Sequence, residues 1–169
     1  MRKQRQNPVR KLTLLILIVA GFFLANVSLQ AEGQWSTGQT FDAIRYEDQH
    51  GKLRILDASV QYVIFLADMD AKDSLHQFLQ DAGQPWLDNH KAVVVADIHE
   101  MPYLVSVMFA LPAMRDYSYA LHLIREAGPG ERFPAKAGQL TLIRLENRKV
   151  MSIEIFETGK ALIEAIESR

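Results

Sequence analysis

The stretch VIFLADMDAKDSL, residues 63–75, runs an apolar segment directly into three closely spaced aspartates and then into the start of a helix. Residues 60–67 are rich in β-branched and aromatic side chains and show almost no polar alternation, which is typical of a strand covered on both faces. The sequence therefore predicts a central strand, with Asp68, Asp70 and Asp73 at its carboxyl end.

The segments around this strand predict a hairpin, a helix and a second strand. Two short extended segments flank the turn DQHGK at residues 48–52, which indicates a β-hairpin. Apolar residues at helical spacing follow Ser74, and the predicted helix stops at Gly83, with Pro85 as a breaker. Residues 91–98 predict a second buried strand.

The rest of the chain completes one α/β domain. Residues 115–128 predict a helix that ends at a glycine, residues 140–156 predict two strands joined by a turn at 146–148, and residues 157–169 predict a closing amphipathic helix. The expected order is hairpin, strand, helix, strand, helix, strand, strand, helix. We expect a central mixed sheet with flanking helices and no second domain.

The first 31 residues have the layout of a signal peptide. An uncharged run of 14 residues, 12–25, follows a basic start and is shorter than the roughly 20 residues of a membrane-crossing helix. We predict cleavage after Ala31, a domain over residues 32–169 and a periplasmic location in a bacterial cell. The alternative is an uncleaved anchor in the inner membrane, with the domain facing the periplasm and only the N-terminal segment in contact with the membrane.

Charge and cysteine content exclude several functions. Residues 1–31 hold five of the 19 Lys and Arg residues and no acidic residue, so the remaining 14 face 20 Asp and Glu residues, a formal charge of −6. Nucleic acid is therefore not an expected partner. The chain has no cysteine, which rules out thiol chemistry and thiolate metal sites in its own side chains.

Two segments resemble the redoxin branch of the thioredoxin-like superfamily. Residues 41–67, FDAIRYEDQHGKLRILDASVQYVIFLA, contain the "DQ-x-GK" turn before the strand that leads to that family's active site, and residues 140–156, LTLIRLENRKVMSIEIF, resemble its terminal hairpin. The resemblance covers about residues 41–168 and implies a single thioredoxin-like domain. Fold does not determine activity, so the positions of the functional residues matter more.

Those positions have lost the family's chemistry. The resemblance places its two reactive cysteines at Asp70 and Asp73 and its cis-proline at Leu140. It therefore argues against a thiol oxidoreductase, a disulfide isomerase and a peroxiredoxin.

The aspartates have a structural and a catalytic interpretation. Ser74 and Gln77 match a capping box, and acidic residues near a helix start interact favourably with its dipole, by about 0.3–1 kcal/mol each. Alternatively, the apolar strand followed by Asp-x-Asp resembles the first motif of haloacid-dehalogenase-type phosphatases, in which Asp68 would attack phosphorus and Asp70 would handle the proton, with Mg²⁺ bound. Lys72 departs from that motif, and no later paired-aspartate motif completes a metal site.

His99 is the other candidate for chemistry. It follows the second buried strand in DIHEMPY, and the carboxyl ends of strands are where α/β folds bind ligands. His99 could join Asp70 or Asp73 in a mixed nitrogen and oxygen metal site, or act with Asp68 and Asp70 in a metal-dependent hydrolase. An exposed loop histidine is the simpler interpretation. No cofactor is expected. His122 is expected within an amphipathic helix, facing solvent or hydrogen-bonded to its own turn.

Residues 101–114, MPYLVSVMFALPAM, carry no charge and include two prolines. Exposed apolar, Met-rich surfaces adapt to varied partners, so Tyr103, Met108, Phe109 and Met114 are candidates for an interaction surface, with core packing as the alternative. The sequence thus predicts an exported, non-catalytic binding or envelope-assembly domain. Its partner, a protein or a small ligand, is not identified by any motif.

Overall fold

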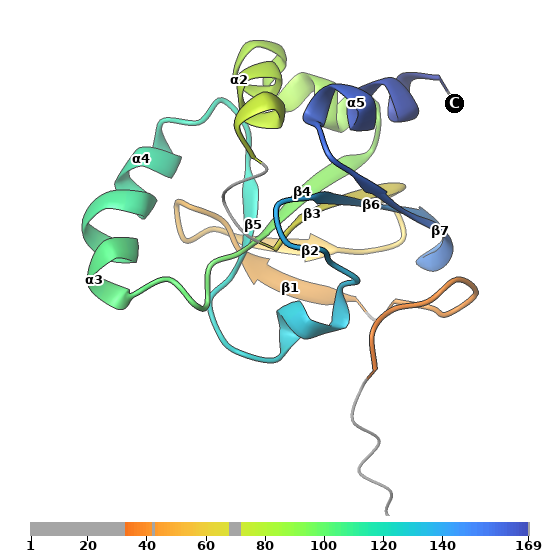
Figure 1. Ribbon diagram of the computed structural model, residues 1–169, viewed down its shortest axis with the longest axis horizontal. Helices are drawn as coiled ribbons and strands as arrows, with labels where there is room; N and C mark the ends of the chain where they lie inside the picture. Colours follow the sequence, from red (N-terminus) through yellow and green to blue (C-terminus); the bar gives the residue numbers. More distant parts are fainter. Residues whose placement is uncertain (1–32, 42, 68–71, 169) are drawn as a thin grey trace, which may run out of the picture. The chain divides into compact units, whose positions relative to one another are not determined.

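A computed structural model describes residues 33–41, 43–67 and 72–168 (Figure 1). The residues from Gly33 onward form one compact unit built on a seven-stranded mixed sheet in the order β2-β1-β5-β4-β3-β6-β7. The strands are β1 (Ile44–Glu47), β2 (Leu53–Leu56), β3 (Tyr62–Leu66), β4 (Ala92–Asp97), β5 (Leu121–Ile124), β6 (Leu140–Glu146) and β7 (Lys149–Phe156). The helices are α2 (Lys72–Asn89), α3 (Tyr103–Val105), the π-helix η1 (Ser106–Ala110), α4 (Leu111–Arg115), the 3-10 helix η2 (Pro129–Arg132) and α5 (Gly159–Glu167).

Strand β3 lies inside the sheet, as its composition predicts. It pairs in parallel with β4 and antiparallel with β6, and its four residues from Val63 to Leu66 are at most 4% exposed. Successive side chains of a strand point to opposite faces, so Ile64 and Leu66 enter one core cluster and Val63 and Phe65 the other. Full burial of each such side chain contributes about 1.5–3 kcal/mol.

The two faces of the sheet are covered differently. Helices α2 and α5 cover one face and supply Leu75, Leu79 and Leu162 to its core (Figure 1). An aromatic stack covers the other face, where Trp35 lies on Phe41 with ring centroids 4.0 Å apart. The residues just after Trp35 also extend the sheet, since the Gly38 and Phe41 N–H groups donate to carbonyls of Val150 and Arg148 beside β7.

The predicted end of the first helix at Gly83 is confirmed, but a second helical segment follows it directly. Helix α2, Lys72–Asn89, consists of two helical segments that meet at Gly83, whose φ of 69° and ψ of −172° are not helical. The N–H of Gln84 donates to the Ser118 carbonyl, and Pro85 then opens the second half of the helix, a position where proline loses no hydrogen bond. Gly83 therefore ends the first helical segment, and the sequence does not predict the second segment that runs to Asn89.

The predicted helix over residues 115–128 is wrong. Residues 121–124 form strand β5, which pairs in parallel with β4 and is buried at all four positions. The helical segments lie earlier, between Tyr103 and Arg115, in a stretch that is uncharged up to Met114. His122 is consequently buried in a strand, and not solvent-facing within a helix.

The hairpins and the final helix are confirmed. Strands β1 and β2 flank the turn at 48–52, and β6 and β7 are joined by Asn147 and Arg148, both with positive φ as a tight two-residue turn requires. Helix α5 begins after Thr158, whose hydroxyl accepts a hydrogen bond from the Ala161 N–H. Gly159 then packs directly against the Leu75 backbone, so α5 crosses α2 closely.

Candidate ligand-binding site at the carboxyl ends of β4 and β5

The loop after β4 holds an ordered Asp–His pair. The Asp97 carboxylate accepts hydrogen bonds from the His99 N–H at 3.0 Å and from His99 Nδ1 at 2.7 Å. The hydrogen bond that His99 donates to Asp97 is the main cause of a raised His99 pKa, which desolvation opposes. Gly130 packs against the Asp97 carboxylate so closely that a β-carbon there would displace it. The imidazole is thus held in one orientation, with Nε2 left on the open side, 4.0 Å from Glu100.

A cavity of about 370 Å³ lies beside this pair. Its lining combines apolar side chains, one imidazole, one hydroxyl and one guanidinium. The residues are Ile98, His99, Met101, Tyr103, Ser106, Val107, Leu111 and Arg125. Arg125 reaches across from the end of β5, with its guanidinium 3.3 Å from the Asp48 carbonyl and 3.9 Å from the Glu47 carboxylate. The cavity therefore lies where the parallel strands β4 and β5 end, the edge at which α/β folds bind ligands.

Large apolar side chains are exposed along one side of this cavity. We call them the apolar face. They are Tyr103, Leu104, Val105, Val107, Met108 and Phe109. Tyr103 is 77% exposed, Met108 61% and Phe109 67%, and they belong to the α3–α4 segment that lies to the left of the sheet in Figure 1. Six such residues within seven positions are unusual on the surface of a folded domain.

The backbone of the apolar face is a π-helix over Ser106–Ala110. The N–H of Leu111 bonds to the Ser106 carbonyl, five residues earlier, so this segment is wider than an α-helix. Single π turns inside helices are frequent at functional sites. The widened turn is flanked by buried residues, because Leu111 and Met114 in α4 face the core.

Met114 does not belong to the surface that the sequence predicted for it. Its side chain is 1% exposed and packs in the cluster with Leu111 and Leu121. Tyr103, Met108 and Phe109 are exposed, and whether they bind a partner stays a prediction. Met114 is buried because α4 packs its apolar side chains into the core, whereas α3 and η1 leave theirs exposed or partly exposed.

The predicted metal site stays untested. Asp68 and Asp70 lie outside the described residues, Asp73 is exposed in the first turn of α2, and His99 is paired with Asp97. Within the described part of the chain, no three His, Asp or Glu side chains are placed to hold an ion together. Leu140, the position matched to the family's cis-proline, is fully buried at the start of β6 opposite Leu66.

Two residues near this edge of the sheet carry no signal that the sequence alone reveals. Arg125 falls within the predicted helix over residues 115–128, although a cation directly after a short apolar run such as LHLI also fits a strand end. Tyr46 falls in the first predicted hairpin, and in the structure it is buried and lines a second cavity. In the described residues, no helix has the length and apolar character needed to cross a membrane.

No protein-family model matches the sequence. No curated protein matches it either. Several solved structures are similar to this chain in fold. A Neisseria meningitidis protein described as a thioredoxin has a TM-score of 0.55 at 15% identity, over 79% of this chain and 90% of that one. A Chlorobium tepidum protein described as the thiol:disulfide interchange protein DsbE has a TM-score of 0.54 at 18% identity, over 80% and 95%. Peroxidoxin BcpB of Mycobacterium tuberculosis has a TM-score of 0.53 at 18% identity, over 80% and 96%.

Identities below 20% show the shared fold alone. The expectation of a single thioredoxin-like α/β fold without the catalytic cysteines is thereby confirmed for this chain. The activities named for those proteins belong to them.

Proposed function

We propose that this thioredoxin-like, cysteine-free chain is an exported, non-catalytic binding protein that holds an envelope protein through its apolar face. The observation that carries the proposal is the exposure of six large apolar side chains in seven consecutive residues, beside a cavity at the carboxyl ends of β4 and β5. A partner that covers these side chains gains about 25 cal/mol for each Å² of apolar surface removed from water.

The apolar face has the composition of a binding surface. Aromatic and methionine side chains are enriched in the centres of protein interfaces, where charged residues are scarce. No charged residue occurs between Met101 and Met114, Glu100 and Arg115 flank the stretch in sequence, and Arg125 lines the adjoining cavity. Arginine at the rim of an apolar patch is the charged residue that interfaces favour.

Aspartate substitutions test the proposal. A photo-crosslinking amino acid in place of Tyr103 reports contact with the envelope partner. Met108→Asp and Phe109→Asp each introduce a charge at the centre of the apolar face, and we expect either substitution to abolish this crosslink. Leu53→Asp, at an exposed apolar position of β2, is the matched control and should leave the crosslink unchanged. Circular dichroism of each variant verifies the fold. Crosslinks of equal strength in the Met108→Asp variant would reject the apolar face as the binding surface.

Export is tested separately. We propose that residues 1–31 direct the chain across the inner membrane and are removed. Mass spectrometry of the protein isolated from cells should then give an N-terminus at Glu32 and a periplasmic fraction. An intact N-terminus in the membrane fraction would support the alternative, an inner-membrane anchor that leaves the domain facing the periplasm.

A metal-dependent hydrolase is the second candidate. The paired Asp97 and His99 place an oriented imidazole at the wall of a cavity, near the strand end from which Asp68 and Asp70 follow. Thermal unfolding with and without Mg²⁺, Mn²⁺, Ca²⁺ and Zn²⁺ tests this candidate, because an ion bound only by the folded state raises the midpoint. A shift that Asp70→Asn abolishes, together with phosphatase activity that Asp68→Asn abolishes, would support the hydrolase over the binding protein.

A further inference from the structure

Strands β1 and β5 are neighbours in the sheet but are paired at one position only, Glu47 with Leu123. A regular antiparallel ladder would continue with Tyr46 opposite Ile124 and Arg45 opposite Arg125. Neither pair is formed, so the two strands separate beyond Glu47. We call the opening between them the seam.

The main chain of both strands faces the seam. The Ile98 N–H donates to the Ile124 carbonyl, so the Ile124 main chain points toward β4. The Asp48 N–H donates to the Lys52 carbonyl, so the main chain of Asp48 points away from β5. Because these directions alternate along a strand, the N–H and C=O groups of Arg45 and Arg125 point toward each other across the seam. No hydrogen bond joins these two residues in the described structure.

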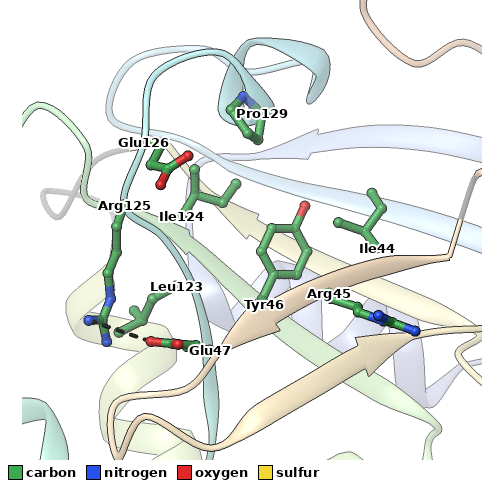
Figure 2. A pocket seen from close by; sticks show the side chains of 9 residues that line it. All are labelled: Ile44, Arg45, Tyr46, Glu47, Leu123, Ile124, Arg125, Glu126 and Pro129. Atoms are coloured by element: carbon green, nitrogen blue, oxygen red, sulfur yellow. Dashed lines mark ion pairs between the residues drawn. The ribbon is translucent and has the colours of Figure 1, made fainter.

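A cavity of about 340 Å³ occupies the open end of the seam (Figure 2). Ile44, Ile124 and Pro129 give it apolar walls, and Figure 2 shows the Tyr46 ring standing between Ile44 and Ile124. The rim carries charges of both signs. They are Arg45, Glu47, Arg125 and Glu126.

Tyr46 supplies an independent sign that the cavity takes a ligand. The residue is only 6% exposed, and its hydroxyl has no hydrogen-bond partner. Figure 2 shows this hydroxyl directed toward the Pro129 side of the cavity. Burial raises the pKa of the phenol, so Tyr46 stays neutral and can donate its proton in a hydrogen bond. A buried hydroxyl without a partner is unfavourable, and a bound acceptor would satisfy it.

We infer that the seam is a docking site for an extended peptide segment of a partner protein. The peptide main chain pairs with the facing groups of Arg45 and Arg125, as in strand addition to a sheet edge. One apolar peptide side chain fills the cavity between Ile44 and Ile124, and a peptide carbonyl accepts the hydrogen bond from the Tyr46 hydroxyl. The mixed charges of the rim match the charged side chains that flank an apolar residue in such a segment.

An extended peptide suits this site better than a compact small molecule. The main chains of Arg45 in β1 and of Arg125, directly after β5, face the opening from both sides, and an extended backbone can pair with such groups. The seam is separate from the apolar face, although Arg125 lines both cavities. The inference therefore does not depend on the function proposed above.

The experiment uses selection and a backbone-modified ligand. Random twelve-residue peptides displayed on phage are selected on the purified protein, with counter-selection on the Ile44→Trp variant, whose indole would fill the mouth of the cavity. The enriched peptide is then synthesised in its natural form and with N-methyl groups on alternate amides, which keep the side chains but remove main-chain donors. Affinity is measured by fluorescence anisotropy.

We expect at least tenfold weaker binding of the N-methylated peptide and of the natural peptide to Ile44→Trp. Tyr46→Phe, which removes only the hydroxyl, should weaken binding several-fold without loss of thermal stability. Amide NMR signals of Arg45 and Arg125 should shift on binding to the wild type. Met108→Asp should bind the peptide as the wild type does, which separates a failure of the seam from a failure of the apolar face.

Three results would overturn the inference. They are no enrichment of any peptide over the counter-selecting variant, equal affinity for the natural and N-methylated peptides, and amide shifts at Tyr103 and Met108 in place of Arg45 and Arg125. If Ile44→Trp does not fold, the selection runs without counter-selection, and equal affinity for the natural and N-methylated peptides or amide shifts away from Arg45 and Arg125 would overturn the inference.

Discussion

The side-chain amide of Gln49 acts as a strand partner for Leu121. Its Oε1 accepts a hydrogen bond from the Leu121 N–H at 2.9 Å, and its Nε2 donates to the Tyr119 carbonyl at 2.7 Å. Gln49 is buried in the turn between β1 and β2. The Gln49 side chain thus joins the hairpin turn to the start of β5, next to the position where Glu47 pairs with Leu123.

Replacement of Gln49 by alanine should destabilise the protein. The change leaves two buried main-chain groups without partners, at about 1–3 kcal/mol each. We expect the free energy of unfolding in urea to fall by roughly 2–4 kcal/mol. Gln77→Ala, at an exposed position of α2, is the control and should change stability by less than about 0.5 kcal/mol. Equal stability of the two variants would show that water replaces the Gln49 amide.

His122 should make stability depend on pH between about 6.5 and 4. Burial is the main cause that lowers its pKa from 6.5 to about 4, so the folded protein holds a neutral imidazole. The unfolded chain takes up a proton first as the pH falls, and the stabilisation, full above pH 6.5, is lost by about pH 4. The expected loss is roughly 3 kcal/mol at 1.36 kcal/mol per pKa unit.

Urea titrations at several pH values measure this dependence. His122→Leu should flatten the stability profile between pH 6.5 and 4, whereas His50→Gln, in the exposed hairpin turn, should retain it. Asp48 acts at lower pH. Burial opposes its ionisation, but hydrogen bonds from Lys52, Arg54 and His50 outweigh it and lower the Asp48 pKa. Its contribution is therefore lost below the pH range assigned to His122.

Removal of the Asp97 charge should lower the His99 pKa. In the wild type, the hydrogen bond to Asp97 raises that pKa and favours the imidazolium. We expect the His99 ring signals of Asp97→Asn to titrate at lower pH in proton NMR, and those of Gly130→Ala to move in the same direction because its β-carbon displaces the carboxylate. Glu100→Gln should have a smaller effect, since Glu100 lies 4.0 Å away. An unchanged titration in Asp97→Asn would contradict the pairing.

Gly159→Ala should loosen the contact between α5 and α2. Its added methyl group would meet the backbone and β-carbon of Leu75, which cannot move without shifting the helix start. Overpacking of this kind costs about 1–3 kcal/mol, and thermal unfolding measures it. Gly33→Ala meets no atom within 4 Å and is the matched control. A midpoint in Gly159→Ala equal to that of Gly33→Ala would mean that α5 shifts without cost.

The sequence predicts the fold wherever periodicity and turn residues agree. Residues 60–67 have the composition of a central strand and form one, and both hairpins carry their turn residues. It fails at residues 121–124, because a four-residue apolar run fits a buried strand and a buried helix equally well. Gly83 ends the first helical segment as predicted, but no residue pattern shows that a second segment resumes at Pro85, after the Gln84 N–H has bonded to the Ser118 carbonyl.

The sites are less predictable than the fold. His99 follows from its place after a predicted strand, but its pairing with Asp97 depends on the loop conformation. Exposure divides residues 101–114 in a way that composition cannot show, because Met108 and Met114 differ only in the direction they face. The seam arises from two strands 77 positions apart that diverge, and no local pattern in either records that separation.

Because Gly38 and Phe41 pair with the β6–β7 hairpin, the position at which a shortened chain begins should decide whether it aggregates. Sheet edges with free N–H and C=O groups recruit other chains, and the outer strand at the opposite end, β2, is only four residues long. Residues 38–41 shield the start of the longer edge. A chain shortened to begin at Ala43 would lose this shield together with the Trp35–Phe41 stack, and we expect it to aggregate edge to edge during expression, whereas a chain beginning at Glu32 would not.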